Sequence, residues 1–167
     1  MSAQLEIPNI NIDAIPHHLR DIALAAHELV ERSFTAPQDF YIPPFKVENS
    51  NFMLRAYWEA ASANADTYEK IALHLGTNAL MISHEHKHPR SSQLPYVGKP
   101  LPKEFVRETI VLEQGKATLF PTGPFGVAEY EDITQNPEQG KAFTNRVGHA
   151  LSTLGIKLYS QSLLKVS

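Results

Sequence analysis

Residues 105–120 read FVRETIVLE, QG and KATLF, and this stretch carries the strongest β signal in the chain. Residues 105–113 are rich in β-branched and apolar side chains, which favour a strand. Gln114-Gly115 can form a two-residue turn, after which residues 116–120 can return antiparallel. A third strand could follow over residues 125–130. We therefore predict a β-hairpin or a three-stranded meander in this part of the chain.

Helices are expected on both sides of this hairpin. Pro16 suits the first turn of a helix whose apolar residues recur at helical spacing and which should stop before Pro37. After the hairpin, Asn136-Pro137 reads as a cap residue followed by proline, and Gly155 should end the helix that starts there. These two helices are the first and last helices of the predicted fold.

Two further helices are expected between residues 50 and 76. The first covers residues 50–60. The second covers residues 66–75, where Asp66 and Glu69 form a capping-box pattern and Gly76 can serve as a C-cap. The sequence of residues 78–87 fits either a short helix or a strand.

The predicted order is helices, then strands, then a helix, which indicates an α+β fold with N-terminal helices, a β-hairpin or three-stranded meander, and a C-terminal helix. Residues 1–167 are expected to form a single domain, because the connector over residues 35–49 carries aromatic side chains suited to packing on a core. The residues expected to be buried are Leu19, Ile22, Phe52, Ile71, Leu75, Phe143, Val147 and Leu151.

Composition limits the function classes. The chain has no cysteine, which excludes disulfides, thiolate metal sites and cysteine nucleophiles. No secretory signal and no apolar run long enough to span a bilayer is visible, so we expect a cytoplasmic protein without a membrane partner. The net charge is −3, which argues against a surface that binds nucleic acid throughout. A local basic stretch nevertheless includes Lys87, Arg90, Lys99, Lys103 and Arg107.

One candidate site is a helix-turn-helix over residues 67–87. Residues 67–83 resemble the helix-turn-helix pattern of bacterial and phage regulators in general, although Glu85 stands where such motifs usually keep an apolar residue. The resemblance implies a recognition helix in a major groove. An ordinary αα-hairpin is the alternative. The residues that would contact nucleic acid are Asn78, Ser83, His84, Lys87 and Arg90.

A second candidate is the histidine cluster His84, His86 and His88. On a strand all three rings point to one face, where a metal could lie between them, whereas on a helix they spread around the axis. Glu129 or Glu131 could supply a carboxylate ligand. The alternative is a solvated polar turn before Pro89.

Two weaker patterns lie on the expected helices. The segment His27-Glu28-Leu29-Val30-Glu31 resembles the zincin helix, but glutamate replaces its second histidine. Pairs of arginine and histidine, Arg20 with His27 and Arg146 with His149, could hold phosphate and move a proton. Arg146 is more simply expected to be solvated or paired with a nearby carboxylate.

The leading interpretation is a small cytoplasmic regulatory or accessory protein that contacts DNA through the helix-turn-helix-like segment. The alternatives are a metal-dependent enzyme that uses His84, His86 and His88, and a protein–protein interaction module. The sequence assigns no catalytic residue, cofactor or metal ligand, and the expected partners are DNA, another protein or a second copy of the chain. The conformation of residues 80–88 separates the first two interpretations.

Overall fold

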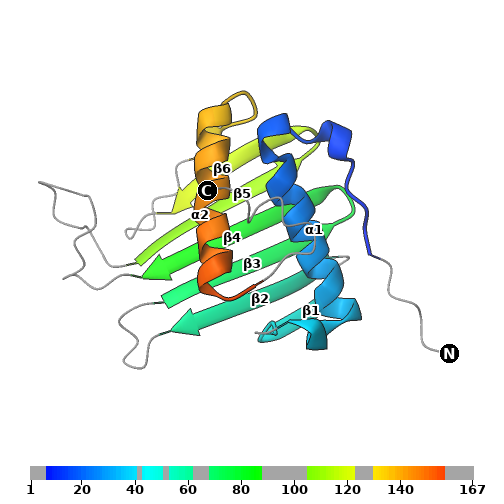
Figure 1. Ribbon diagram of the computed structural model, residues 1–167. Coiled ribbons are helices and arrows are strands. Elements are labelled where there is room, and N and C mark those ends of the chain that lie inside the picture. Colours follow the sequence, from blue (N-terminus) through cyan, green and yellow to red (C-terminus); the bar gives the residue numbers. More distant parts are fainter. Residues whose placement is uncertain are drawn as a thin grey trace, which may run out of the picture.

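The computed structural model describes residues 7–40, 43–50, 53–61, 68–87, 105–122 and 130–156. Helix α1 (Arg20–Thr35) precedes a seven-stranded antiparallel sheet, and helix α2 (Pro137–Thr153) follows it. Both helices lie side by side across one face of the sheet (Figure 1). Short 3-10 turns flank α1, namely η1 (Ile12–Ala14), η2 (His17–Leu19) and η3 (Pro37–Asp39).

The strands follow one another across the sheet in sequence order, so the sheet is a meander in which each strand pairs with its neighbour in the chain. The strands are β1 (Lys46–Ser50), β2 (Met53–Ala61), β3 (Tyr68–Gly76), β4 (Ala79–Lys87), β5 (Phe105–Glu113), β6 (Lys116–Thr122) and β7 (Glu131–Asp132). The α+β class is therefore confirmed, with a sheet longer than the three strands predicted.

The predicted hairpin is present as β5 and β6, with Glu113 opposite Lys116. Gln114 and Gly115 have φ values of 52° and 78°. Positive φ at both turn residues is the geometry of a type I′ hairpin, whose twist matches that of the flanking strands. Residues 125–129 of the expected third strand lie outside the described residues, and β6 pairs next with β7.

The two outer helices are also confirmed. In α2 the side chain of Asn136 accepts a hydrogen bond from the backbone N–H of Gln139, and Pro137 occupies the first helical turn. Gly155, with a φ of 71°, follows the last turn. At the other helix, α1 ends at Thr35, before Pro37.

The helices expected over residues 50–60 and 66–75 are wrong, because the described parts of these segments belong to β1, β2 and β3. In β3, Ile71, Leu73 and Leu75 are buried with a period of two, as on a strand that packs on one face. Ala72, on the other face, is also apolar and is only 8% exposed. The sequence of β3 therefore lacks the strict alternation of apolar and polar residues that would have indicated a strand. Residues 78–87, whose sequence fits either a short helix or a strand, contain the strand β4.

The core lies between the helices and the sheet. Leu19 and Ile22 near the start of α1, and Phe143, Val147 and Leu151 on α2, pack in one cluster with the inward-facing residues of β2 to β6. Each described residue expected in the core is buried. Phe52 lies outside the described residues. Neither helix in the described part of the chain is long and apolar enough to cross a membrane.

Candidate metal centre on the helix-covered face

Three neighbouring central strands bring acidic and imidazole side chains together at one end of the strands. Strand β3 begins, β4 ends and β5 begins at this end, on the left of Figure 1. The register places Glu69 opposite His86, and His84 opposite Glu108. Because side chains alternate between faces along a strand, His84 and His86 share the face of buried Ile82, which the helices cover.

His84 lies between two carboxylates. Its side chain is 4% exposed, with Nε2 2.8 Å from Glu69 Oε2 and Nδ1 3.2 Å from Glu108 Oε2. The ring of His86 lies beside it, with 5.0 Å between the two centroids. Each nitrogen of the buried imidazole therefore has an acidic partner.

Helix α2 completes the arrangement through Arg146. Its Nε and Nη2 donate to the two oxygens of Glu108, at 2.9 Å to Oε2 and 2.7 Å to Oε1. This two-point contact fixes the plane of the carboxylate and favours its ionised form. The expectation that Arg146 pairs with a carboxylate is confirmed, and the pair ties α2 to β5.

The charge of His84 follows from these contacts. Burial alone lowers the pKa of His84, but the hydrogen bonds to Glu108 and Glu69 and their negative charges outweigh it and raise this pKa to about 9. Burial also raises the pKa of Glu108, yet the hydrogen bonds from His84 and Arg146 and their charges hold it below its ordinary value. At neutral pH the protein without metal holds His84 as an imidazolium ion.

The same side chains fit a divalent ion. One ligand atom from each of Glu69, His84 and His86 can be chosen so that all lie within 4.8 Å of one another. Bonds of about 2 Å to zinc place the ligand atoms around one ion within roughly 4 Å, so a modest side-chain rotation completes the set. With Nε2 of His84 turned to the ion, Nδ1–H still donates to Glu108, which is the carboxylate–histidine–metal arrangement common behind metal ligands.

Sequence reasoning found this site in part. It identified His84 and His86 as a pair on one strand face, and their convergence with Glu69 agrees with the metal alternative. Glu69 was assigned only a capping role, and Glu108 was not singled out. An acidic residue in the otherwise apolar inward-facing series Glu108, Ile110 and Leu112 is the signal that could have revealed it. His88 and Glu129 lie outside the described residues, and Glu131 in β7 accepts from Asn136 instead.

The residues expected to contact DNA do not form one surface. The described parts of the two expected helices are the strands of the β3–β4 hairpin, so no recognition helix exists in residues 68–87. Ser83 bonds to Thr109 on the face opposite to buried His84, while Asn78 is exposed in the turn at the far end of β4. The side chains of Lys87 and Arg90 lie outside the described residues. Contact with DNA by another geometry stays a prediction.

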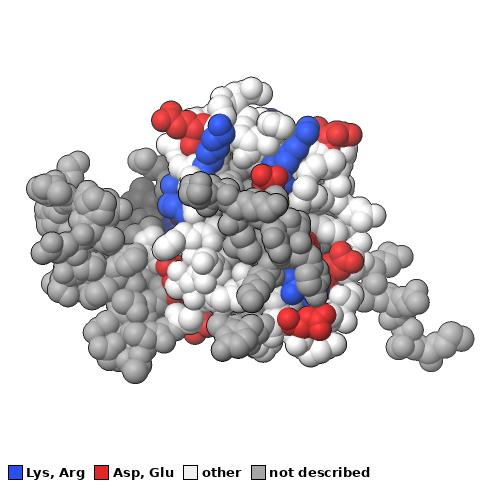
Figure 2. Space-filling model, viewed as in Figure 1, with Lys and Arg blue, Asp and Glu red and all other residues white. Residues whose placement is uncertain are grey.

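The electrostatic surface of the helix-bearing face is mixed. Figure 2 shows lysine and arginine side chains interspersed with aspartate and glutamate over the described residues of this face, without a large patch of one sign. The described residues of this face show no basic stripe of the kind typical of a nucleic-acid footprint.

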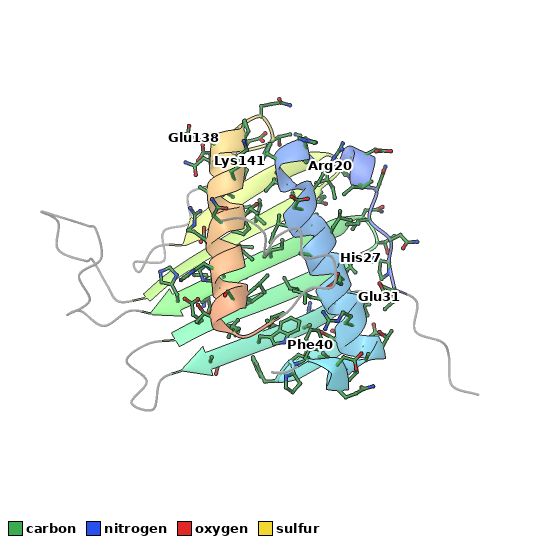
Figure 3. The ribbon with its side chains drawn as sticks, in the orientation of Figure 1. Arg20, His27, Glu31, Phe40, Glu138 and Lys141 are labelled. Atoms are coloured by element: carbon green, nitrogen blue, oxygen red, sulfur yellow. The ribbon has the colours of Figure 1, made fainter. Side chains whose placement is uncertain are left out.

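The weaker patterns on the helices have structural partners. His27 Nε2 lies 2.8 Å from the carbonyl oxygen of Pro8, and its Nδ1 is 3.8 Å from Glu31 on the side of α1 away from α2 (Figure 3). Arg20 donates to the carbonyl oxygen of Ile15. His149 is exposed, while Arg146 is held by Glu108.

Comparison of the chain with protein-family models, with curated proteins and with solved structures gives no match.

Proposed function

We propose that this protein binds one divalent transition-metal ion through Glu69, His84 and His86, and that its activity depends on that ion. The observation that carries the proposal is the convergence of these three side chains on adjacent strands, with Glu108 and Arg146 supporting His84 from behind. The proposal replaces the assignment of no metal made from the sequence.

The ligand chemistry favours a catalytic rather than a structural site. Two imidazoles and one carboxylate are nitrogen and oxygen donors that suit Zn²⁺, Fe²⁺ or Mn²⁺, and the chain has no thiolate to complete a closed site. Three protein ligands leave at least one coordination position for water or substrate. The ion would there act as a Lewis acid and lower the pKa of a bound water.

Glu108 and Arg146 have distinct tasks in this proposal. The carboxylate of Glu108 accepts the Nδ1–H of His84, which fixes the tautomer that leaves Nε2 free for the ion. Arg146 holds both oxygens of Glu108 and so prevents that carboxylate from rotating into the ligand position. Removing either residue should weaken metal binding without removing a ligand.

The test is metal analysis of the purified protein followed by titration with Zn²⁺, Mn²⁺ and, without oxygen, Fe²⁺. We expect one equivalent of one of these ions, lost in a His84→Ala, His86→Ala double variant. Glu108→Gln should weaken binding by roughly ten- to a hundredfold, as is usual for a group that orients a ligand. His149→Ala, which removes an exposed histidine of α2, is the matched control and should bind as the unaltered protein does.

A folded protein that binds none of the three ions at micromolar concentration would overturn the proposal. So would equal losses in the double variant and in His149→Ala. In the first case Glu69, His84, Glu108 and Arg146 would be a structural ion network that joins α2 to the sheet. The interpretations as a DNA-contacting protein and as an interaction module stay predictions that this experiment leaves aside.

A further inference from the structure

The second face of the sheet lies opposite the two helices. Both α1 and α2 cover the other face (Figure 1). An antiparallel sheet with one face in water usually carries polar residues on that face. Here the outward positions in the middle of β3 to β6 are apolar or uncharged, namely Ala72, His74, Met81, Ser83, Thr109, Val111, Thr118 and Phe120. A continuous surface of this kind is typical of a site that another protein covers.

The centre of this face carries no charge at neutral pH. His74 is the only ionisable side chain among these residues, and burial, followed by the positive charge of Arg55, lowers its pKa below the ordinary 6.5. The hydroxyls of Ser83 and Thr109 satisfy each other at 2.9 Å. A protein that covers this centre therefore buries no unpaired ion there.

A row of charged side chains borders the uncharged centre. The register places them side by side across β2 to β5, with alternating signs, in the order Glu59, Lys70, Glu85 and Arg107. Within the chain, Arg107 Nε lies 2.6 Å from Glu85 Oε1. The row is therefore neutral in sum, and its pattern reads with opposite signs from its two ends.

This reversal makes the row complementary to a second copy of itself. A two-fold axis that runs along the strands between β3 and β4 reverses the order of the strands and keeps each row at the same height. Glu59 of one copy then faces Arg107 of the other, and Lys70 faces Glu85. Stacked sheets cross at about 30°, which displaces positions this close to the axis by only about one residue.

Aromatic side chains lie at both margins of the same face. Phe45 is 55% exposed, with its ring 6.0 Å from that of Tyr57 on β2. Tyr130 is 73% exposed, with its ring 6.0 Å from that of Phe120 on β6. The same two-fold axis brings the β1 margin of one copy to the β6 margin of the other, so these exposed rings would be covered together.

The area of the face suits a stable dimer. Strands β2 to β5 are each nine residues long, and β6 has seven. With strands about 4.8 Å apart and about 3.3 Å per residue, these five strands span roughly 24 Å by 30 Å, or about 700 Å². A standard protein interface buries about 800 Å² on each partner.

We infer that two copies of this chain pack through the uncovered faces of their sheets, about a two-fold axis that runs along the strands between β3 and β4. The dimer buries the uncharged centre and matches the alternating row with its own reversed copy. The inference does not rest on the metal centre, which lies on the helix-covered face.

The experiment is sedimentation velocity of the full chain in chelator at micromolar concentrations, where we expect twice the chain mass of 18.7 kDa. Lys70→Glu and Glu85→Lys each place like charges opposite one another at two symmetry-related points. Each variant alone should weaken dimerisation by about a hundredfold or more. An equimolar mixture of the two should form a heterodimer, because each introduced charge then faces an opposite one.

The matched controls are Lys141→Glu and Glu138→Lys, the same substitutions at exposed positions of α2 (Figure 3). Neither should change the dimer. Met81→Lys, which adds a charge to the uncharged centre, is a second disrupting variant that leaves the charged row intact. It should be monomeric with an unaltered circular dichroism spectrum, and it decides the matter if a charge variant does not fold.

Three results would overturn the inference. The first is an unaltered chain that stays monomeric across the micromolar range, which would leave the face to a different partner. The second is a dimer that persists in Met81→Lys or in either charge variant, which would place the interface elsewhere. The third is a mixture of folded Lys70→Glu and Glu85→Lys chains that stays monomeric. Chelator is present throughout, so none of these results depends on whether the protein binds a metal.

Discussion

At the scale of single residues, His84 combines burial with two acidic partners. Glu69 and Glu108 contact its two ring nitrogens, and Arg146 and His86 complete the groups around it. The proton on His84 therefore stabilises the metal-free fold but must leave before the ring can bind a metal.

The protonation of His84 in the folded state predicts that the stability of the metal-free protein depends on pH. The pKa of His84 rises on folding from its ordinary 6.5 to about 9, so its contribution is fully present below pH 6.5 and is lost as the pH rises through about 9. The pKa of Glu108 is lowered on folding, so its contribution is present above its ordinary pKa of 4.5 and is lost as the pH falls. Urea unfolding in chelator should show the free energy of unfolding declining between pH 6.5 and 9. In His84→Gln this decline should vanish, and a flat profile in the unaltered protein would contradict the charge assigned to His84.

Gly140 yields a second prediction at this scale. A Cβ at this position of α2 would overlap the ring of His18, whose Nε2 lies 3.1 Å from the carbonyl oxygen of Thr134. Glycine to alanine within a helix usually stabilises by about 1 kcal/mol. Here Gly140→Ala should instead destabilise by roughly 1–3 kcal/mol, as overpacking does. Thermal or urea unfolding measures the change, and adding His18→Ala should reverse its sign relative to His18→Ala alone.

At the scale of elements, α2 is attached to the sheet by both apolar packing and the Arg146–Glu108 pair. Leu151 is 1% exposed and lies in the shared core. Leu151→Ala should lower the free energy of unfolding by roughly 2–5 kcal/mol, the range for a buried leucine. Ser152→Ala, at an exposed neighbour, should change it by less than about 0.5 kcal/mol. Equal effects of the two substitutions in urea unfolding would contradict the placement of Leu151.

At the scale of the whole molecule, both helices cover one face of one sheet and share one hydrophobic cluster. Trp58, the only tryptophan, is fully buried in this cluster, with its ring 5.5 Å from that of Phe40. We predict a single cooperative transition, in which tryptophan fluorescence and far-ultraviolet circular dichroism give the same urea midpoint. A separate earlier transition in circular dichroism alone would contradict this prediction and show that part of the secondary structure unfolds before the core around Trp58.

Elements whose signals are local can be predicted from the sequence. Gln114-Gly115 specifies a hairpin because only a turn with positive φ joins two twisted strands over two residues. Asn136-Pro137 specifies a helix start because the cap and the ring both act within one turn. The α+β class and the burial of Leu19, Ile22, Phe143, Val147 and Leu151 follow from such signals and from apolar spacing on the two outer helices. Ile71 and Leu75 are also buried, but on a strand and not on the helix predicted there.

Long-range pairing is needed to recognise β2 and β3 and to bring Glu69, Glu108 and Arg146 to the histidines of β4. Strands pair with partners elsewhere in the chain, so the capping pattern at Asp66 and the glycine at Gly76 could not reveal that residues 68–76 lie between two strands. His84 and its acidic partners are 15 and 24 positions apart in the chain, and Arg146 is 38 positions from Glu108. Only the register of three strands and the packing of α2 bring these charges within hydrogen-bond distance, because register sets which side chains face each other and which face they share.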